Sequence, residues 1–178
     1  MRSLALLLVL LQAAACSHRS QPAPPAAAAP PAASSDQPVA REHPGGSTRL
    51  MAVRTSTADG ATRMEFEFDA RVPSYRVAYT DSVRACGSGE DVALPGNARL
   101  VVAFRNAAAH DDAGHATVAD RDRSPGLPGL LALRLFCDFE GDVSWAAALP
   151  RRAPFAVSEL SSPPRLLVRL APASNGGR

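Results

Sequence analysis

The sequence predicts an all-β fold over residues 48–172, namely an antiparallel β-sandwich of about eight short strands. Three observations indicate this class. Short segments alternate apolar and polar residues with period two, which is typical of half-buried strands. Turn-forming residues separate these segments at near-regular spacing. No segment between them shows a convincing helical period.

The first two expected strands are separated by a tight turn. Residues 49–57 are followed by Asp59 and Gly60, and glycine tolerates the positive φ that such a turn requires. The next segment, residues 63–69, alternates strictly between apolar and acidic side chains. Its apolar face is formed by Met64, Phe66 and Phe68, and its opposite face by Glu65, Glu67 and Asp69.

A third strand follows Pro73, which interrupts the pattern. Tyr75, Val77 and Tyr79 repeat the alternation after the proline. Because only a short turn separates this strand from residues 63–69, we expect the two strands to pair as a hairpin.

The second half of the domain is more apolar. Residues 99–104 form a nearly continuous apolar run, which is consistent with a more buried strand. A polar segment over residues 106–128 follows, and a loop of this length is typical of a functional or a mobile segment. Further strands are expected over residues 130–139, 143–149, 155–160 and 165–170.

The first sixteen residues have the order of a bacterial export signal. Arg2 gives a basic start, residues 4–11 are an uninterrupted apolar run, and three alanines precede Cys16. The run is shorter than the roughly 20 apolar residues of a membrane-spanning helix, so we expect residues 1–15 to be a cleaved signal peptide. A cysteine at this junction is typical of lipoproteins, and Cys16 is the predicted lipidation site. The alternative is ordinary signal-peptidase cleavage, which would release a soluble secreted chain.

A Pro/Ala-rich segment follows the predicted anchor, and we expect residues 16–47 to be a disordered tether. Proline disfavours helix, and a polyproline-like segment spans about 3.1 Å per residue. The segment can also be read as a tail without a spacing role. Several acyl chains on Cys16 would anchor the chain stably to a lipid bilayer. Ser17 favours the outer membrane if the host is Gram-negative, and residues 173–178 are expected to be a disordered tail.

The charge balance argues against a nucleic-acid partner. The chain has 19 basic and 17 acidic residues, and every basic residue is an arginine. Nucleic-acid binding would call for a strongly basic face. The sequence also contains no phosphate-binding glycine loop, no zinc-finger spacing and no dinucleotide fingerprint. We therefore predict no cofactor and no enzymatic activity.

Cys86 and Cys137 are the two cysteines that follow the predicted processing site. An even pair outside the cytoplasm is most simply a disulfide. Such a bridge would close a loop of about 50 residues and stabilise the fold by roughly 3–4 kcal/mol in the chain-entropy model. The alternative is two separate thiols.

The acidic stripe of Glu65, Glu67 and Asp69 has two interpretations. It can form cross-strand ion pairs with arginines such as Arg76 on the neighbouring strand, or it can be a glycan-binding face. Trp145 likewise can stack on a sugar or lie in the core. We retain the three acidic residues as candidate binding residues.

The second candidate cluster lies in the long polar segment. His110, Asp111, Asp112 and His115 bring two imidazoles and two carboxylates within six residues, which suits zinc or a similar ion. The alternatives are a solvated polar loop, or a general acid–base pair of His110 with Asp111. We predict His110 and Asp111 as candidate binding residues, but no metal site and no catalytic residue, because no nucleophile is identifiable beside them.

A series of short motifs runs through nearly all of residues 48–172. They lie at residues 63–69, 73–77, 87–90, 94–96, 109–111, 138–141, 152–155 and 162–166. In this order they resemble the AMIN-like domain family of bacterial envelope proteins. The resemblance implies a β-sandwich that serves as a targeting module and binds peptidoglycan or other envelope components.

We therefore expect a non-enzymatic binding module, exported and lipid-anchored to the bacterial membrane, that contacts peptidoglycan or another envelope component. One alternative is a structural or assembly lipoprotein that binds only a protein partner. The other is a metal-dependent hydrolase that uses the loop from His110 to His115.

Overall fold

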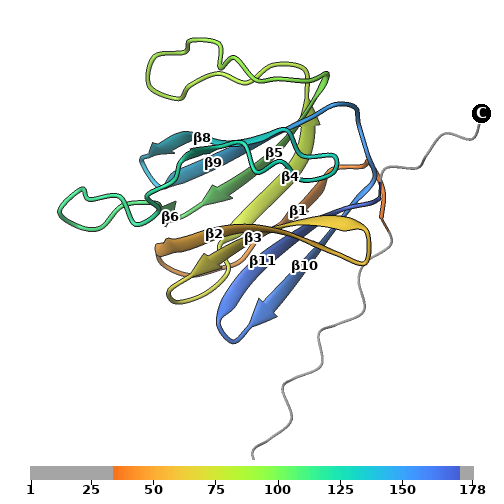
Figure 1. Cartoon of the computed structure of the whole chain (residues 1–178). Helices are drawn as coiled ribbons and strands as arrows, with labels where there is room; N and C mark the ends of the chain where they lie inside the picture. Colours follow the sequence, from red (N-terminus) through yellow and green to blue (C-terminus); the bar gives the residue numbers. More distant parts are fainter. Residues whose placement is uncertain (1–33, 173–178) are drawn as a thin grey trace, which may run out of the picture.

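The computed structural model describes residues 34–172, which form two β-sheets packed face to face (Figure 1). No helix occurs in this range, and so none is long and apolar enough to cross a membrane. The predicted antiparallel β-sandwich is confirmed, with more strands than expected. The strands are β1 (Val39–Arg41), β2 (Thr48–Ala58), β3 (Ala61–Phe68), β4 (Ser74–Thr80), β5 (Ala98–Arg105), β6 (Ala107–Ala108), β7 (Asp122–Arg123), β8 (Ala132–Phe139), β9 (Asp142–Leu149), β10 (Phe155–Ser161) and β11 (Pro164–Leu170).

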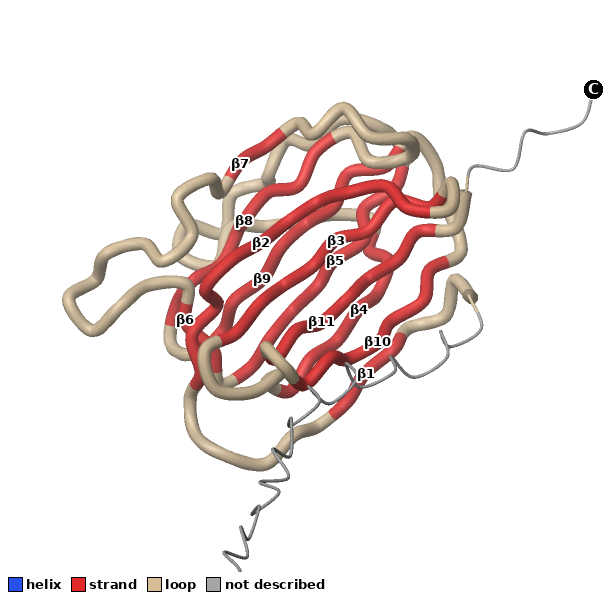
Figure 2. The backbone as a smooth tube through the Cα atoms, turned by 60° about the horizontal axis from the view of Figure 1, so that its bottom comes forward, coloured by secondary structure: helices blue, strands red, loops and turns tan. Residues whose placement is uncertain are grey.

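The two sheets have different strand orders. The six-stranded sheet runs β1-β4-β5-β9-β8-β7, and the five-stranded sheet runs β10-β11-β3-β2-β6. The short β6 pairs parallel with β2, whereas the other paired strands are antiparallel. The long strands of both layers run in similar directions in Figure 2, as in an aligned sandwich.

The core lies between the sheets and follows from the alternation in the sequence. Phe66 and Phe68 on β3 are almost fully buried, and each ring meets Phe104 of β5 edge-on, with centroids 5.3 and 5.0 Å apart. Trp145 on β9 has no exposed surface. It is therefore a core residue, and the interpretation of Trp145 as a sugar-stacking side chain is wrong.

The turn at Asp59 and Gly60 is confirmed. Both residues adopt positive φ, 53° and 72°, and the flanking strands β2 and β3 pair in antiparallel register. The second predicted hairpin is wrong, because β3 and β4 belong to different sheets. The apolar faces of both strands contribute to the core between the sheets, and β4 pairs with β5 and β1 instead. Alternation identifies the buried face of a strand but not the sheet that contains it.

The part of the predicted disordered tether that the structure describes, residues 34–47, contains a strand and pairs with the domain. Val39–Arg41 form β1, which pairs with β4, and Ser35 exchanges backbone hydrogen bonds of 3.0 and 2.8 Å with Phe155. Proline composition disfavours helix, but it does not prevent the residues between prolines from joining an edge strand. The predicted signal peptide, Cys16 and the C-terminal tail lie outside the described residues.

The predicted disulfide is confirmed. Cys86 bonds to Cys137 across a sequence separation of 51 residues, with the Cα atoms 5.2 Å apart. The bridge attaches the segment between β4 and β5 to β8 of the six-stranded sheet. Arg134 adds a hydrogen bond of 2.9 Å to the Ala93 carbonyl of the same segment.

Candidate functional site

A polar pocket of about 470 Å³ lies where β2 begins and β3 ends. Its walls come from the start of β2, the residue after β3, the short β6 and the loop that follows β6. That loop protrudes from the sandwich beside β6 in Figure 1. The lining residues are Ser47, Thr48, Arg49, Asp69, Ala108, His110, Asp111, Asp112 and Gly114.

The loop after β6 is held by its own backbone hydrogen bonds. His110 and Ala116 form an isolated antiparallel bridge, and the Asp111 amide donates to the His115 carbonyl at 2.8 Å. Gly114 supplies the turn with a φ of +83°, a conformation that glycine adopts without steric cost. The long polar segment expected from the sequence is therefore ordered at this point.

Asp111 is an ionised acceptor at the pocket wall. Its Oδ1 accepts backbone hydrogen bonds from His115 at 2.8 Å and from Ala113 at 2.9 Å, and its Oδ2 lies 3.2 Å from Nδ1 of His115. These bonds, led by that from the His115 amide, hold the pKa of Asp111 below its ordinary value. Asp111 therefore carries its negative charge at neutral pH.

Asp69 supplies a second carboxylate from the opposite wall. Its Oδ1 accepts hydrogen bonds from the Thr48 hydroxyl at 2.7 Å and from the Arg49 amide at 2.9 Å. Desolvation alone would raise the pKa of Asp69, but these hydrogen bonds and one from the Ala70 amide outweigh it, so the pKa is lowered. The carboxylate is fixed against the start of β2 and stays ionised.

His110 is oriented by a carboxylate behind it. Its Nδ1 lies 2.9 Å from Oδ1 of Asp138, which is only 10% exposed and also accepts from the Ala109 amide at 2.9 Å. Arg121 lies 3.2 Å from the other oxygen of Asp138. This contact orients the ring through Nδ1, and Nε2 is the ring nitrogen that Asp138 does not engage.

Among the described residues that line the pocket, Arg49 contributes the guanidinium group. Its guanidinium donates to Oδ1 of Asp112 at 2.7 Å, and Asp112 is 93% exposed. The pocket therefore combines three carboxylates with one guanidinium and one histidine, so its charged groups are mainly hydrogen-bond acceptors. Such a lining suits ligand groups that donate, namely hydroxyls and ammonium groups.

The structure separates the candidate residues into two groups. Asp69, His110 and Asp111 line the pocket, whereas Glu65 and Glu67 lie on the outer face of the five-stranded sheet. The two glutamates are engaged in ion pairs there. Arg54 donates to Glu67 at 2.6 Å and to Glu65 at 3.4 Å, and Arg165 donates to Glu65 at 3.2 Å.

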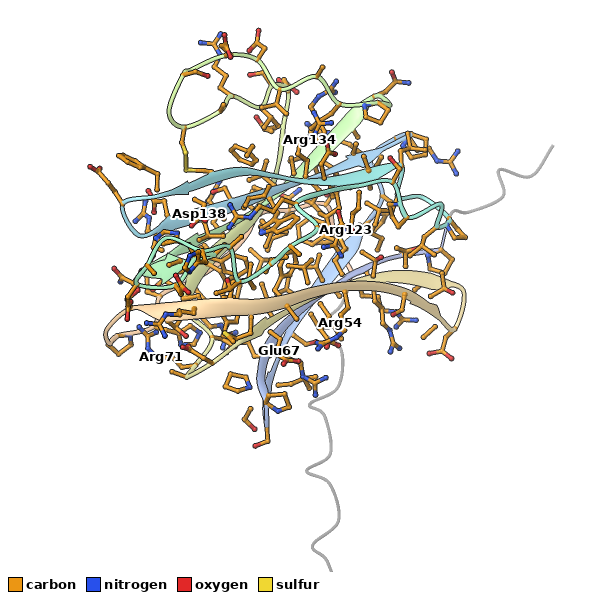
Figure 3. All side chains as sticks on the ribbon, turned by 60° about the vertical axis from the view of Figure 1, so that its left-hand side comes forward. Arg54, Glu67, Arg71, Arg123, Arg134 and Asp138 are labelled. Carbon is orange, nitrogen blue, oxygen red and sulfur yellow. A yellow bond between two sulfur atoms is a disulfide. The ribbon has the colours of Figure 1, made fainter. Side chains whose placement is uncertain are left out.

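The cross-strand ion pairs predicted for the acidic stripe therefore exist, but with different arginines. Figure 3 shows Arg54 and Glu67 close together on the side of the five-stranded sheet that faces away from the other sheet. Arg76, the arginine expected to neutralise the stripe, lies on β4 in the six-stranded sheet. The predicted pairing of Arg76 with the acidic stripe is wrong, because it assumed that β3 and β4 form a hairpin.

Sequence reasoning missed the residues that position the pocket. Thr48 and Arg49 hold Asp69, and Asp138, which pairs with Arg121, holds His110. The pocket joins four separate parts of the chain, and no local pattern reports that these parts meet. The only sequence signal was that Asp138 falls within one of the short motifs.

The residues described by the structure contain no group of three or more His, Cys, Asp or Glu side chains arranged to hold a metal ion. Within the loop, His115 is paired with Asp111, whereas His110 turns to Asp138. The two imidazoles therefore have separate partners, and the structure offers no preformed ligand set for the hydrolase alternative.

A β-sandwich whose charged pocket is built from hydrogen-bonded carboxylates, an arginine and a positioned histidine has the features of a binding module. A family model for the AMIN-like domain matches residues 48–172, and the chain belongs to the AMIN-like domain family. At the family level this is a peptidoglycan-related binding domain of envelope proteins, not known as enzymatic. No curated protein and no solved structure matches the chain.

Proposed function

We propose that this chain is a lipid-anchored, non-enzymatic module that binds peptidoglycan through the pocket between β2, β3 and the loop after β6. The observation that carries the proposal is the convergence of Asp69, Asp111 and His110 on one cavity. Cys16 would attach the chain to the membrane, so that the domain faces the cell wall from a Pro/Ala-rich tether.

The chemistry of the pocket supports this ligand. Peptidoglycan presents sugar hydroxyls and the amino groups of its stem peptides, all of which donate hydrogen bonds. Two carboxylates with lowered pKa remain ionised acceptors at neutral pH, and charge-assisted hydrogen bonds are roughly twice as strong as neutral ones. Arg49 offers a donor for a carbonyl or carboxylate of the same ligand.

Cosedimentation of the full chain with protein-free peptidoglycan sacculi tests the proposal. We expect saturable pelleting that weakens about tenfold in the double variant Asp69→Asn with Asp111→Asn, which corresponds to about 1.4 kcal/mol of binding free energy. Glu67→Gln is the control, because it neutralises a carboxylate outside the pocket, on the outer face of the sheet, where Arg54 donates to it.

Each outcome has a separate meaning. Without saturable pelleting, direct wall binding is refuted, and association with a protein in cell extract would support the assembly-lipoprotein alternative. Pelleting that the double variant and Glu67→Gln weaken equally would retain wall binding but remove the pocket from it.

A further inference from the structure

An arginine pair stands on the outer face of the five-stranded sheet. Arg63 on β3 and Arg169 on β11 are direct partners in the antiparallel register. Their neighbours Met64 and Val168 are fully buried, so the two arginines point away from the core. Side chains directly opposite in antiparallel strands have Cβ atoms about 4.5–5.5 Å apart, and like charges at this separation repel.

Carboxylates of the described chain neutralise this pair only weakly. Arg63 lies 3.4 Å from Oδ2 of Asp59, whose side chain is 80% exposed. Arg169 has no hydrogen bond or ion pair within residues 34–172. The Nε atoms of both arginines are buried and have no hydrogen-bond partner. Two guanidinium groups therefore lie opposite each other on neighbouring strands, and each has an N–H donor without a hydrogen-bond partner.

The other strands of the sheet do not compensate the pair. The same row contains Ser56 on β2 and Ala156 on β10, neither of which is charged. The nearest carboxylate on this face of β3 is Glu65, which already accepts from Arg54 and Arg165. Over the outward-facing positions of β2, β3, β11 and β10 there are five arginines against two glutamates, and one of the five, Arg49, pairs with Asp112 at the pocket. The two glutamates are those held by Arg54 and Arg165, and the excess positive charge lies at Arg63 and Arg169.

We propose that Arg63 and Arg169 form an oxyanion site that takes a carboxylate or a phosphate group. The planar guanidinium fork matches both groups through paired hydrogen bonds. An anion between the two arginines would replace like-charge repulsion with two attractive contacts. The outer N–H groups of the two partly exposed guanidinium groups are the donors that such a ligand would reach, because the Nε atoms are buried.

The oxyanion site is separate from the pocket and has the opposite charge preference. Arg63 and Asp69 are six positions apart along β3 and its extension, which corresponds to roughly 20 Å at the rise of a strand. The oxyanion site thus goes beyond the proposed function and does not depend on peptidoglycan being the ligand of the pocket.

Nuclear magnetic resonance of the arginine Nε–Hε groups in the full chain tests the oxyanion site. Sodium phosphate and sodium glutarate are titrated separately against sodium chloride of equal ionic strength. We expect the Arg63 and Arg169 signals to shift saturably with at least one anion. Saturation by phosphate alone identifies phosphate as the ligand group, saturation by glutarate alone identifies carboxylate, and saturation by both establishes a general oxyanion site.

Two variants and one control define the site. Arg169→Gln should abolish the saturable shift of the Arg63 signal, and Arg169→Lys should weaken the affinity several-fold, because lysine keeps the charge but loses the fork. Arg76→Gln removes an exposed arginine of the other sheet that lies opposite an alanine, and it should change nothing. If neither anion saturates the two signals, or if all exposed arginines shift alike, the oxyanion site is refuted.

Discussion

Asp138 is the residue on which the order of the pocket wall depends. Asp138, which is labelled in Figure 3, is 10% exposed. It accepts hydrogen bonds from the Ala109 amide and His110 while pairing with Arg121. Arg121 also donates to the Ala109 carbonyl at 2.5 Å. The carboxylate thus connects β8 to the segment that leads into the loop after β6.

We expect Asp138→Asn to lower the free energy of unfolding by about 1–3 kcal/mol, because it removes the charge from a nearly buried acceptor and leaves Arg121 with a weaker partner. Urea denaturation at pH 7 measures this loss. Asp112→Asn is the control, since the Asp112 side chain is 93% exposed and its pair with Arg49 should contribute less than about 1 kcal/mol. Equal losses in the two variants would contradict the role assigned to Asp138.

At the residue scale the sequence predicted part of the site. Asp69 was a candidate because it belongs to the alternating acidic stripe, and His110 and Asp111 because two imidazoles and two carboxylates lie within six residues. Glu65 and Glu67 carried the same signal, yet the structure pairs both with Arg54. A single sequence reveals which side chains are ionisable, but the arginine that neutralises each carboxylate is determined by strand order.

At the scale of elements, the segment between β4 and β5 is attached to the six-stranded sheet at several points. Besides the hydrogen bond from Arg134, these are the disulfide from Cys86 to Cys137 and the close approach of Gly96 to β9. The amide of Asn97 donates to the Leu149 carbonyl at 3.0 Å, and Gly96 has a φ of +78°. A Cβ at Gly96 would lie 2.8 Å from the carbonyl carbon of Leu149.

We expect Gly96→Ala to lower the free energy of unfolding by about 2–3 kcal/mol, because positive φ and overpacking against backbone both act against the new methyl group. Gly87→Ala in the same segment is the control, since a Cβ there meets nothing within 4 Å and its φ is not in the left-handed region. The control should change stability by less than about 1 kcal/mol. Thermal and urea unfolding of both variants measure the difference, and a harmless Gly96→Ala would show that the segment moves freely.

The elements also show where sequence patterns stop being informative. Alternation over β3 and β4 located both strands and their buried faces, which is why Phe66 and Val77 were correctly predicted to point inward. The same alternation gave no information on whether the two strands share a sheet. Short strands such as β1, β6 and β7 have too few residues for any period, so their pairing could not be predicted.

At the scale of the whole molecule, the segment before β2 closes one side of the sandwich. β1 and β10 are edge strands of different sheets and lie at the same side of the molecule in Figure 2. The segment pairs with both sheets. It contributes β1, which pairs with β4 of the six-stranded sheet, and Ser35, which bonds to Phe155 of β10 in the five-stranded sheet. Ser74, which is buried, accepts from the His43 amide at 2.8 Å and donates to the His43 carbonyl at 3.2 Å.

Glu159 on β10 also contacts the segment before β2. Its Oε1 accepts from the Tyr75 hydroxyl at 2.9 Å and lies 3.1 Å from Nε2 of His43 and 3.5 Å from Nε of Arg41. Burial and, after it, the bond to Glu159 raise the pKa of Tyr75 to about 12. Residues on both sheets and on the preceding segment therefore meet at one carboxylate.

A chain that begins at residue 48, where the match to the AMIN-like family begins, should be less stable than one that begins at residue 34. Removing residues 34–47 leaves Ser74 and Glu159 without His43 and opens the outer edges of β4 and β10. With net contributions of about 0.5–1.5 kcal/mol per hydrogen bond, the expected loss is about 3 kcal/mol. Urea denaturation of the two chains measures it.

The same truncation should also change the assembly state. A strand edge without a partner is a template for pairing with another chain, so the shorter chain should self-associate at concentrations where the longer chain is monomeric. Sedimentation velocity distinguishes the two, with the chain from residue 34 as the reference. If the chain from residue 48 is equally stable and monomeric, the folding unit is the family domain alone, and the preceding segment only rests on its edge. The expected result instead makes residues 34–47 part of the fold, attached to both sheets through β4 and Phe155.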